Sequence, residues 1–144
     1  MAEVLSRDDI DAFLRANPAR PAMLATVRSD GRAHVAPVWY EVDDDGSIVF
    51  NTGAETVKGR NLLHSGRASL AVQDDRPPYS FVTIEGPVTI SHDVADVRPW
   101  AARIGGRYLG PDRAEEMGQP NGVPGELVVH LTPEHAVGVA NLTA

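Results

Sequence analysis

The amino-acid sequence predicts a mainly antiparallel β protein, in which six or seven strands form a closed or partly closed barrel with small helices between them. Short stretches of alternating polar and apolar residues recur along most of the chain, and turn signals such as Asp30-Gly31 separate them. Only a few short stretches have helical spacing. Neither G-x-G-x-x-G nor G-x-x-x-x-G-K-S/T follows a strand, so an alternating βαβ fold that binds nucleotides through such a loop is not indicated.

Length and composition narrow the possible functions. A chain of 144 residues has room for one hydrophobic core, so we expect a single domain over residues 1–144. The net charge of -7 argues against nucleic-acid binding, which needs a basic face. No apolar run approaches the ~18 residues of a membrane span. The chain has no cysteine, which excludes sulfur-ligated metals and suits a reducing compartment, so we expect a cytoplasmic protein.

The first elements are a short helix and a three-stranded meander. Ser6 is a typical N-cap, and the apolar residues that follow it are spaced for one helical face, so we expect a helix over about residues 6–16. Prolines at 18 and 21 end it. Strand-like alternation then covers residues 23–28, 33–41 and 47–52, with tight turns between the strands.

The second half alternates between helix and strand patterns. We expect a helix from near Thr56 to Gly66, a strand over 68–73, and a long strand over 80–91 interrupted by a bulge or barrel corner at Gly86-Pro87. Helical patterns follow at 93–104 and 111–117. A closing pair of strands is predicted at 126–131 and 136–139.

The segment from Phe50 to Leu62 carries the clearest functional pattern. It places Thr56, Lys58 and Arg60 where a strand ends and a helix begins, and Lys58 is the only lysine of the chain. Free N–H groups at a helix N-terminus favour an anion, and the hydroxyl and two cations would strengthen its binding. This pattern indicates a phosphate site. Base rates favour the alternative, in which Lys58 and Arg60 are ordinary solvated charges.

Several runs resemble one known family. They are Phe50 to Thr52, Thr56 to Leu62, Arg67 to Val72 and Val82 to Val88. Together they resemble the pyridoxamine-phosphate-oxidase-like split-barrel proteins, and within them the deazaflavin (coenzyme F420)-dependent oxidoreductases. The resemblance implies a split β-barrel of the FMN-binding type. It also implies a homodimer with two sites at the subunit interface, each holding coenzyme F420 or FMN.

The resemblance assigns roles to particular residues. Backbone groups of the second predicted strand would contact the cofactor ring: His34, Ala36, Pro37, Val38 and Trp39. Asn51 and Thr52 would lie along the ribityl chain. The phosphate would be held by Thr56, Lys58, Arg60 and Asn61. We expect the partner subunit to close the site with two aromatic side chains, Tyr79 and Trp100.

Other patterns have simpler explanations. Trp39 and Tyr40 are neighbours on a predicted strand and should face opposite sides, so at least one of them belongs to the core. The five histidines lack the spacing of a metal site, and we expect no metal. Residues 105–110 either border the pocket, with Arg107 and Tyr108 as contacts, or form a flexible exit from a helix.

The resemblance implies a reductase in which the reduced deazaflavin transfers a hydride to an unsaturated small-molecule substrate. Tyr79, His34 or a water molecule would supply the proton. Twelve of the thirteen basic residues are arginine, which is typical of codon usage in GC-rich genomes. This usage favours coenzyme F420 over FMN. Two alternatives stay open: an FMN-dependent oxidase or flavin reductase of the same fold, and a non-catalytic module that binds a flavin, haem or similar ligand. Specificity is expected from residues 74–78 and 100–122.

True pyridoxamine-phosphate oxidases carry an arginine-rich motif near the C-terminus that binds the phosphate of their substrate. Residues 126–144 contain no arginine or lysine. The resemblance therefore does not imply the activity for which the family is named.

Overall fold

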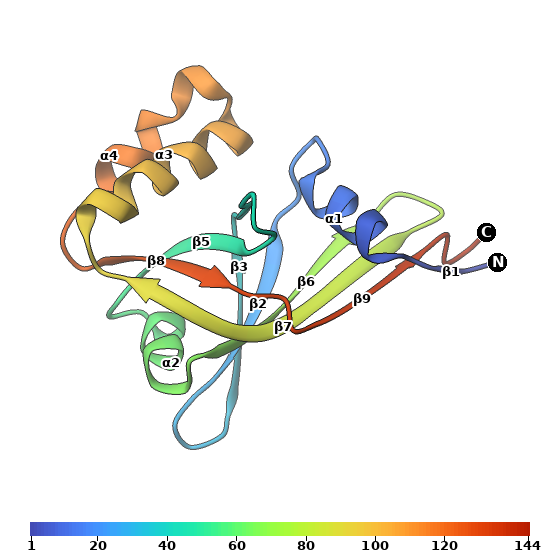
Figure 1. The fold of residues 1–144 in the computed structure, drawn as a ribbon, viewed down its shortest axis with the longest axis horizontal. Coiled ribbons are helices and arrows are strands. Elements are labelled where there is room, and N and C mark those ends of the chain that lie inside the picture. Colours follow the sequence, from blue (N-terminus) through green and yellow to red (C-terminus); the bar gives the residue numbers. More distant parts are fainter.

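A strongly curved antiparallel sheet forms the body of the protein, and one long strand, β7 (Ser80–Ser91), joins its two parts (Figure 1). The computed structural model describes all residues, 1–144. The sheet order is β3-β2-β6-β7-β8-β5-β4, and β9 pairs with both β7 and β1. The fold is therefore the mainly β split barrel that the sequence predicts.

The other strands are β1 (Glu3–Val4), β2 (Ala22–Val27), β3 (Ala33–Val38), β4 (Glu41–Val42), β5 (Ile48–Gly53), β6 (Arg67–Asp74), β8 (Glu126–Leu131) and β9 (His135–Ala140). The helices are α1 (Arg7–Arg15), α2 (Val57–Ser65), α3 (Val94–Leu109), a 3-10 turn η1 (Pro111–Arg113) and α4 (Glu115–Asn121).

The middle of β7 is a barrel corner. Residues 80–87 pair with β6, and residues 88–91 pair with β8 on the other part of the sheet. A Cβ atom on Gly86 would lie only 1.9 Å from the carbonyl oxygen of Thr132, in the connection between β8 and β9 that crosses here. Thr132 N–H donates to Pro87 O at 2.9 Å. The predicted corner is therefore present, but the strand runs through it without interruption.

The inner side of the curved sheet holds one core of 18 buried residues, closed at one end by α1. Ser6 caps α1 by accepting from Asp9 N–H at 3.1 Å, as predicted. Ile10 and Leu14 of this helix are buried against the sheet. Tyr40 is also buried, and its hydroxyl donates to Leu14 O at 2.9 Å. Of the adjacent pair, Tyr40 is thus the core residue and Trp39 remains 37% exposed.

Helices α3 and α4 form a pair above β5 and β8, and α2 lies at the opposite side of that part of the sheet (Figure 1). The predicted helix over 93–104 continues to Leu109. Glycine is a weak helix former, but Gly105 has no side chain to separate α3 from Met117 of α4, because a Cβ there would lie 2.6 Å from the Met117 Cβ. Close packing of the two helices therefore extends α3 through the glycines.

Three strand predictions need correction. The strand predicted over residues 33–41 is divided: β3 ends at Val38 and β4 begins at Glu41, because the Tyr40 backbone between them bonds to side chains of α3 instead of a strand. β8 and β9 are present but do not pair with each other, because β7 lies between them and pairs with both. The two-residue strand β1, which pairs with the end of β9, was not predicted, since two residues carry no periodic pattern.

Candidate active site

A cavity of about 240 Å³ lies where β3, β5 and the start of α2 meet the α3–α4 pair. Its walls are Pro37, Val38, Trp39, Asn51, Lys58, Ala101, Ile104, Met117 and Asn121. Five of these residues belong to the set that the sequence predicts: Pro37, Val38, Trp39, Asn51 and Lys58. The structure therefore brings the predicted ring-contact strand and the predicted phosphate lysine to one cavity.

The strand β3 presents an open edge at this cavity, because it is the outermost strand of the sheet. Arg28 N–H donates to Arg32 O at 2.9 Å, and hydrogen-bonded pairs alternate along an antiparallel ladder. The backbone groups of Val35 and Pro37 consequently point away from β2, toward the open edge. Proline lacks an N–H and is tolerated at such an edge position. The carbonyl of Pro37 is thus a free acceptor beside the cavity.

Lys58 enters the cavity from the first turn of α2. Thr56 caps this helix by accepting from Gly59 N–H at 3.0 Å, and its own hydroxyl donates to Gly53 O at 2.7 Å. Because the single proton of Thr56 is thus committed, Thr52 is the donor in the 3.0 Å contact between the two hydroxyls. These bonds fix the helix start from which Lys58 extends.

Lys58 is a half-buried cation without a partner. Its ammonium group makes no salt bridge and no hydrogen bond with the rest of the chain, whereas nine of the arginines pair with carboxylates. A partly buried cation is stable when an anion or a set of acceptors faces it. Lys58 is therefore the charge on the cavity wall that is available to an anionic ligand.

The other predicted phosphate residues are directed elsewhere. Consecutive residues of a helix are rotated by ~100°, so Arg60 lies on the side of α2 opposite to Lys58. There it pairs with Glu55 at 3.2 Å and lines a separate hollow. Asn61 is buried and donates to the Thr26 hydroxyl at 3.0 Å. The helix thus separates residues that the sequence places side by side.

Two asparagines give the cavity hydrogen-bond acceptors. The Nδ2 group of Asn51 donates to Leu127 O at 3.2 Å, and that of Asn121 donates to Met117 O at 2.8 Å. A carbonyl only accepts, so both amide orientations are fixed and each side chain keeps Oδ1 uncommitted. With Lys58, the wall offers one cation and two amide acceptors among apolar residues. This suits a ligand with an anionic group and N–H or O–H donors on an apolar body.

An aromatic pair supports the Trp39 side of the cavity. The indole of Trp39 stacks on the ring of Tyr108 with centroids 4.7 Å apart and planes 2° apart. Burial raises the pKa of the Tyr108 phenol to about 12, so this hydroxyl stays protonated at neutral pH. Arg107 and Tyr108 are in the last turn of α3 and do not line the cavity. Arg107 and Tyr108 therefore fill neither of the two predicted roles. They do not border the cavity, and they belong to a regular helix in which Tyr108 packs on Trp39.

The remaining predicted residues lie outside the cavity of one chain. Nδ1 of His34 is buried without a hydrogen-bond partner. Tyr79 is in the β6–β7 loop beside the C-terminus, where its carbonyl accepts from Leu142 N–H at 3.0 Å. Trp100 packs edge-on against His130, with ring centroids 5.5 Å apart. A contribution of Tyr79 or Trp100 to a partner's site stays a prediction.

The helical wall was predicted as the segment 100–122, and the residues named within it, Trp100, Arg107 and Tyr108, do not line the cavity. Its contributions come from Ala101 and Ile104 of α3 and from Met117 and Asn121 of α4. The spacings of three and four residues place each pair on one helix face. Met117 and Asn121 could not be identified from the sequence, because the apolar pattern of α4 is short. Their place in the wall depends on how α4 packs on α3. No group of three or more His, Cys, Asp or Glu side chains is arranged to hold a metal ion.

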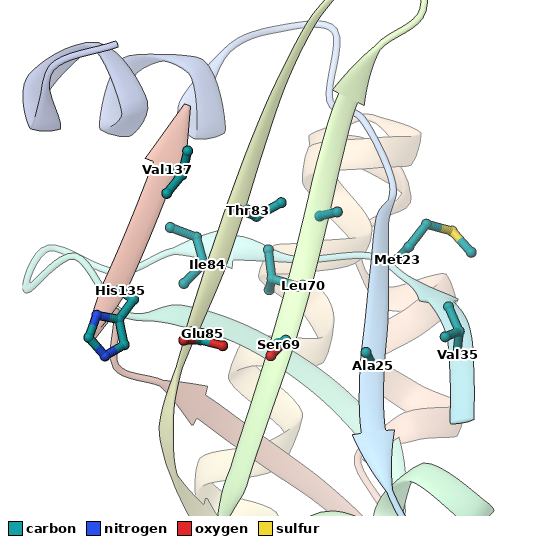
Figure 2. Close-up of a pocket in the computed structure, with 11 residues that line it drawn as sticks. Met23, Ala25, Val35, Ser69, Leu70, Thr83, Ile84, Glu85, His135 and Val137 are labelled. Atoms are coloured by element: carbon teal, nitrogen blue, oxygen red, sulfur yellow. The ribbon is translucent and has the colours of Figure 1, made fainter. Parts of the chain in front are cut away.

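A second, larger hollow of about 450 Å³ lies on the outer face of the sheet (Figure 2). It crosses β9, β7, β6, β2 and β3, and apolar side chains form most of its surface. Met23, Val35 and Val137 are each about half exposed on this face. Polar side chains, Ser69, Glu85 and His135, gather at one end of it (Figure 2). Separately, none of the helices has the length and apolar character that crossing a membrane requires.

Comparisons with known proteins identify the family of the chain. The family model described as pyridoxamine 5'-phosphate oxidase matches residues 6–140. An F420H2-dependent biliverdin reductase of Mycobacterium tuberculosis is 29% identical over 94% of this chain and 89% of its own length. A pyridoxine/pyridoxamine 5'-phosphate oxidase of Mesorhizobium japonicum is 36% identical, but the match covers 62% of this chain and 45% of that protein.

Among solved structures, a conserved hypothetical protein of Mycobacterium tuberculosis superimposes with a TM-score of 0.78 and 28% identity, over 92% of this chain and 83% of that one. The family model spans nearly the whole chain, including every strand of the cavity and both helices of its wall. The chain therefore belongs to the pyridoxamine 5'-phosphate oxidase family of oxidoreductases.

Proposed function

We propose that this protein is a deazaflavin-dependent reductase that uses reduced coenzyme F420 to transfer a hydride to an unsaturated small-molecule substrate. The observation that carries the proposal is the unpaired ammonium group of Lys58 on the wall of a mostly apolar cavity. The F420H2-dependent biliverdin reductase, which aligns with nearly the whole chain, supports the choice of cofactor.

The cavity residues fit such a cofactor. Lys58 would hold the phosphate with a charge-assisted hydrogen bond, since nothing else in the chain competes for its ammonium group. Asn51 would accept from the ribityl chain through its uncommitted Oδ1. The Pro37 carbonyl and the Trp39 indole would border the ring.

When bound, the deazaflavin supplies the hydride chemistry, and the protein supplies orientation and an apolar surface. Ala101, Ile104 and Met117 form this apolar surface on the side of the cavity that faces α3 and α4. No carboxylic acid, imidazole or phenol lines the cavity within one chain. We therefore propose water as the proton donor that follows hydride transfer, in preference to Tyr79 or His34.

We also propose that the active unit is a homodimer, with the outer sheet hollow as its interface. A cavity of about 240 Å³ is smaller than the ~300–1,000 Å³ of typical ligand sites, so a second copy is needed to complete it. β3 connects the two surfaces, because Val35 lines the hollow and Pro37 lines the cavity. A copy seated on the hollow would therefore reach the cofactor. We place this dimer, a single domain over residues 1–144, in the cytoplasm.

Turnover tests the proposed reaction. Reduced coenzyme F420 is mixed with the protein and a panel of enones, quinones and biliverdin, and reoxidation of the cofactor is followed by absorbance. We expect acceptor-dependent reoxidation that exceeds the protein-free rate. If the protein binds the cofactor but none of the acceptors on the panel causes reoxidation, the result favours the non-catalytic binding module.

A second candidate is an FMN-dependent oxidase of the same fold, which the relative from Mesorhizobium japonicum favours. The absence of any arginine or lysine after Arg113 argues against a phosphorylated pyridoxamine as its substrate. Oxygen consumption by the FMN-loaded protein would support this candidate over the reductase.

A further inference from the structure

The backbone between β3 and β4 leaves the sheet at Trp39 and Tyr40, which belong to neither strand. Buried backbone groups without a ladder partner must be satisfied in another way. Both groups of Tyr40 find partners in the last turn of α3. Tyr40 N–H donates to the Tyr108 hydroxyl at 3.2 Å, and Arg107 donates to Tyr40 O at 2.6 Å. The side chains of α3 thus replace a neighbouring strand at this point.

The same two side chains extend these contacts to α1 and to the segment before β2. The Tyr108 hydroxyl donates to Arg20 O at 2.8 Å, and Arg107 donates to Leu14 O at 2.7 Å. The Arg107 guanidinium also lies over the Tyr40 ring, 4.6 Å from its centroid. Every hydrogen-bonding group of the Tyr108 phenol is therefore used, and the end of α3 is anchored at several points.

Trp39 packs against this anchored last turn of α3. With planes 2° apart, Tyr108 covers one face of the indole, while Trp39 remains 37% exposed and lines the cavity. A half-exposed tryptophan at the end of an edge strand would otherwise sample several rotamers, and a ligand would have to order it on binding. Fixing the ring beforehand removes that cost.

We propose that Tyr108 and Arg107 are positioning residues of the cofactor site: they hold the Trp39 indole in one orientation as a preformed wall for a planar ring. This inference rests on the proposed function, which identifies the planar ring as that of coenzyme F420. Neither residue lines the cavity. Tyr108 acts through the stack with Trp39, and Arg107 acts through Tyr108 and the Tyr40 backbone.

The test uses the full-length protein with Trp100→Phe, so that Trp39 is the only tryptophan. Fluorescence anisotropy and acrylamide quenching of Trp39 are measured without ligand for the parent, Tyr108→Leu and Tyr108→Phe. We expect lower anisotropy and faster quenching in Tyr108→Leu, because the stacking partner is lost. Tyr108→Phe keeps the ring but loses the bonds to Tyr40 N–H and Arg20 O, so it should lie between the parent and Tyr108→Leu. Tyr40→Phe, which removes the buried bond to Leu14, is a control for general destabilisation and should leave the Trp39 signal unchanged.

Titration with coenzyme F420 is the second readout. Tyr108→Leu should bind about three- to tenfold more weakly, the range expected from one aromatic pair, and Tyr108→Phe, which keeps the stacked ring, should lose less affinity than Tyr108→Leu. Unchanged anisotropy and quenching of Trp39 in Tyr108→Leu would overturn the positioning role. A more mobile Trp39 in this variant with unchanged cofactor affinity would overturn it as well. A wild-type protein that binds no cofactor would instead refute the proposed function, and the ligand-free fluorescence would still decide whether Tyr108 fixes Trp39.

Discussion

At the scale of single residues, Lys58 and Arg60 show how much the local fold changes the meaning of a motif. In the sequence they are two cations beside a helix start, and they read as one phosphate site. In the structure the helix directs them to different hollows, and Arg60 already has a carboxylate partner. The sequence predicted the position and charge of Lys58, but the direction of each side chain depends on where α2 begins.

This difference gives a prediction with a built-in control. Lys58→Ala should weaken binding of coenzyme F420 by about 1 to 3 kcal/mol, the worth of a hydrogen bond to a charged group, which is about 5- to 150-fold in Kd. Arg60→Ala removes the same charge from the other side of α2 and should change Kd by less than about threefold. Isothermal titration measures both. Equal losses in the two variants would show that Arg60 shares the phosphate, as the sequence motif suggested.

Trp39 and Tyr40 illustrate what alternation can decide. The sequence predicted that at least one of two neighbouring aromatic residues is core, and burial identifies Tyr40 as that residue, although both lie between β3 and β4 and not on a strand. Alternation could not reveal the stack of Trp39 on Tyr108, because the two residues are 69 positions apart and meet only through the packing of α3. Contacts of this kind require the tertiary structure.

At the scale of elements, the corner in β7 depends on the absence of one side chain. Gly86→Ala would force the backbone of Thr132 away from β7, and overpacking of this kind costs about 1–3 kcal/mol or more. We therefore expect a clear loss of unfolding free energy in urea denaturation. Gly53→Ala is the matched control, since its Cβ would meet no atom closer than 3.4 Å. Equal stability of the two variants would contradict the corner as described.

A second element-scale prediction concerns the end of β6. Hydrogen bonds from Arg76, with Arg20 nearby, lower the pKa of Asp74 from 3.8 to about 2. Because the folded-state pKa is depressed, this ion cluster stabilises the fold fully above about pH 4 and loses its contribution as pH falls toward 2.

Asp74→Asn should therefore be less stable than the wild type at pH 7, and the difference should shrink between pH 4 and pH 2. Urea unfolding at a series of pH values measures it, with Asp75→Asn, which has no ion pair, as the control. A difference between wild type and Asp74→Asn that stays constant over this range would show that the Asp74 charge contributes nothing.

The strand pattern was predictable because alternation and turn residues are local signals. The partner of each strand was not. β8 and β9 are consecutive strands joined by a short connection, a pattern typical of a hairpin, yet β7 separates them because the connection crosses at Gly86. Which strands pair is decided by long-range packing.

At the scale of the whole molecule, the exposed apolar hollow and the small cavity are the two observations behind the proposed homodimer. Val137→Arg places a charge on the β9 side of the proposed interface, and burying an unpaired charge is costly. Light scattering should show a dimer for the wild type and a monomer for this variant, with weaker cofactor binding in the monomer. Leu63→Arg, on α2 and of similar exposure, should leave the dimer intact. A wild-type monomer that binds cofactor would contradict an interfacial site.

The central claim is that the cavity at Lys58 binds a deazaflavin. Its most direct test is a titration of the wild-type protein with coenzyme F420 and with FMN, following the quenching of its tryptophan fluorescence. We predict saturable quenching by coenzyme F420, with a lower Kd than FMN gives and with loss of affinity in Lys58→Ala. Tight FMN binding without any response to coenzyme F420 would contradict the account.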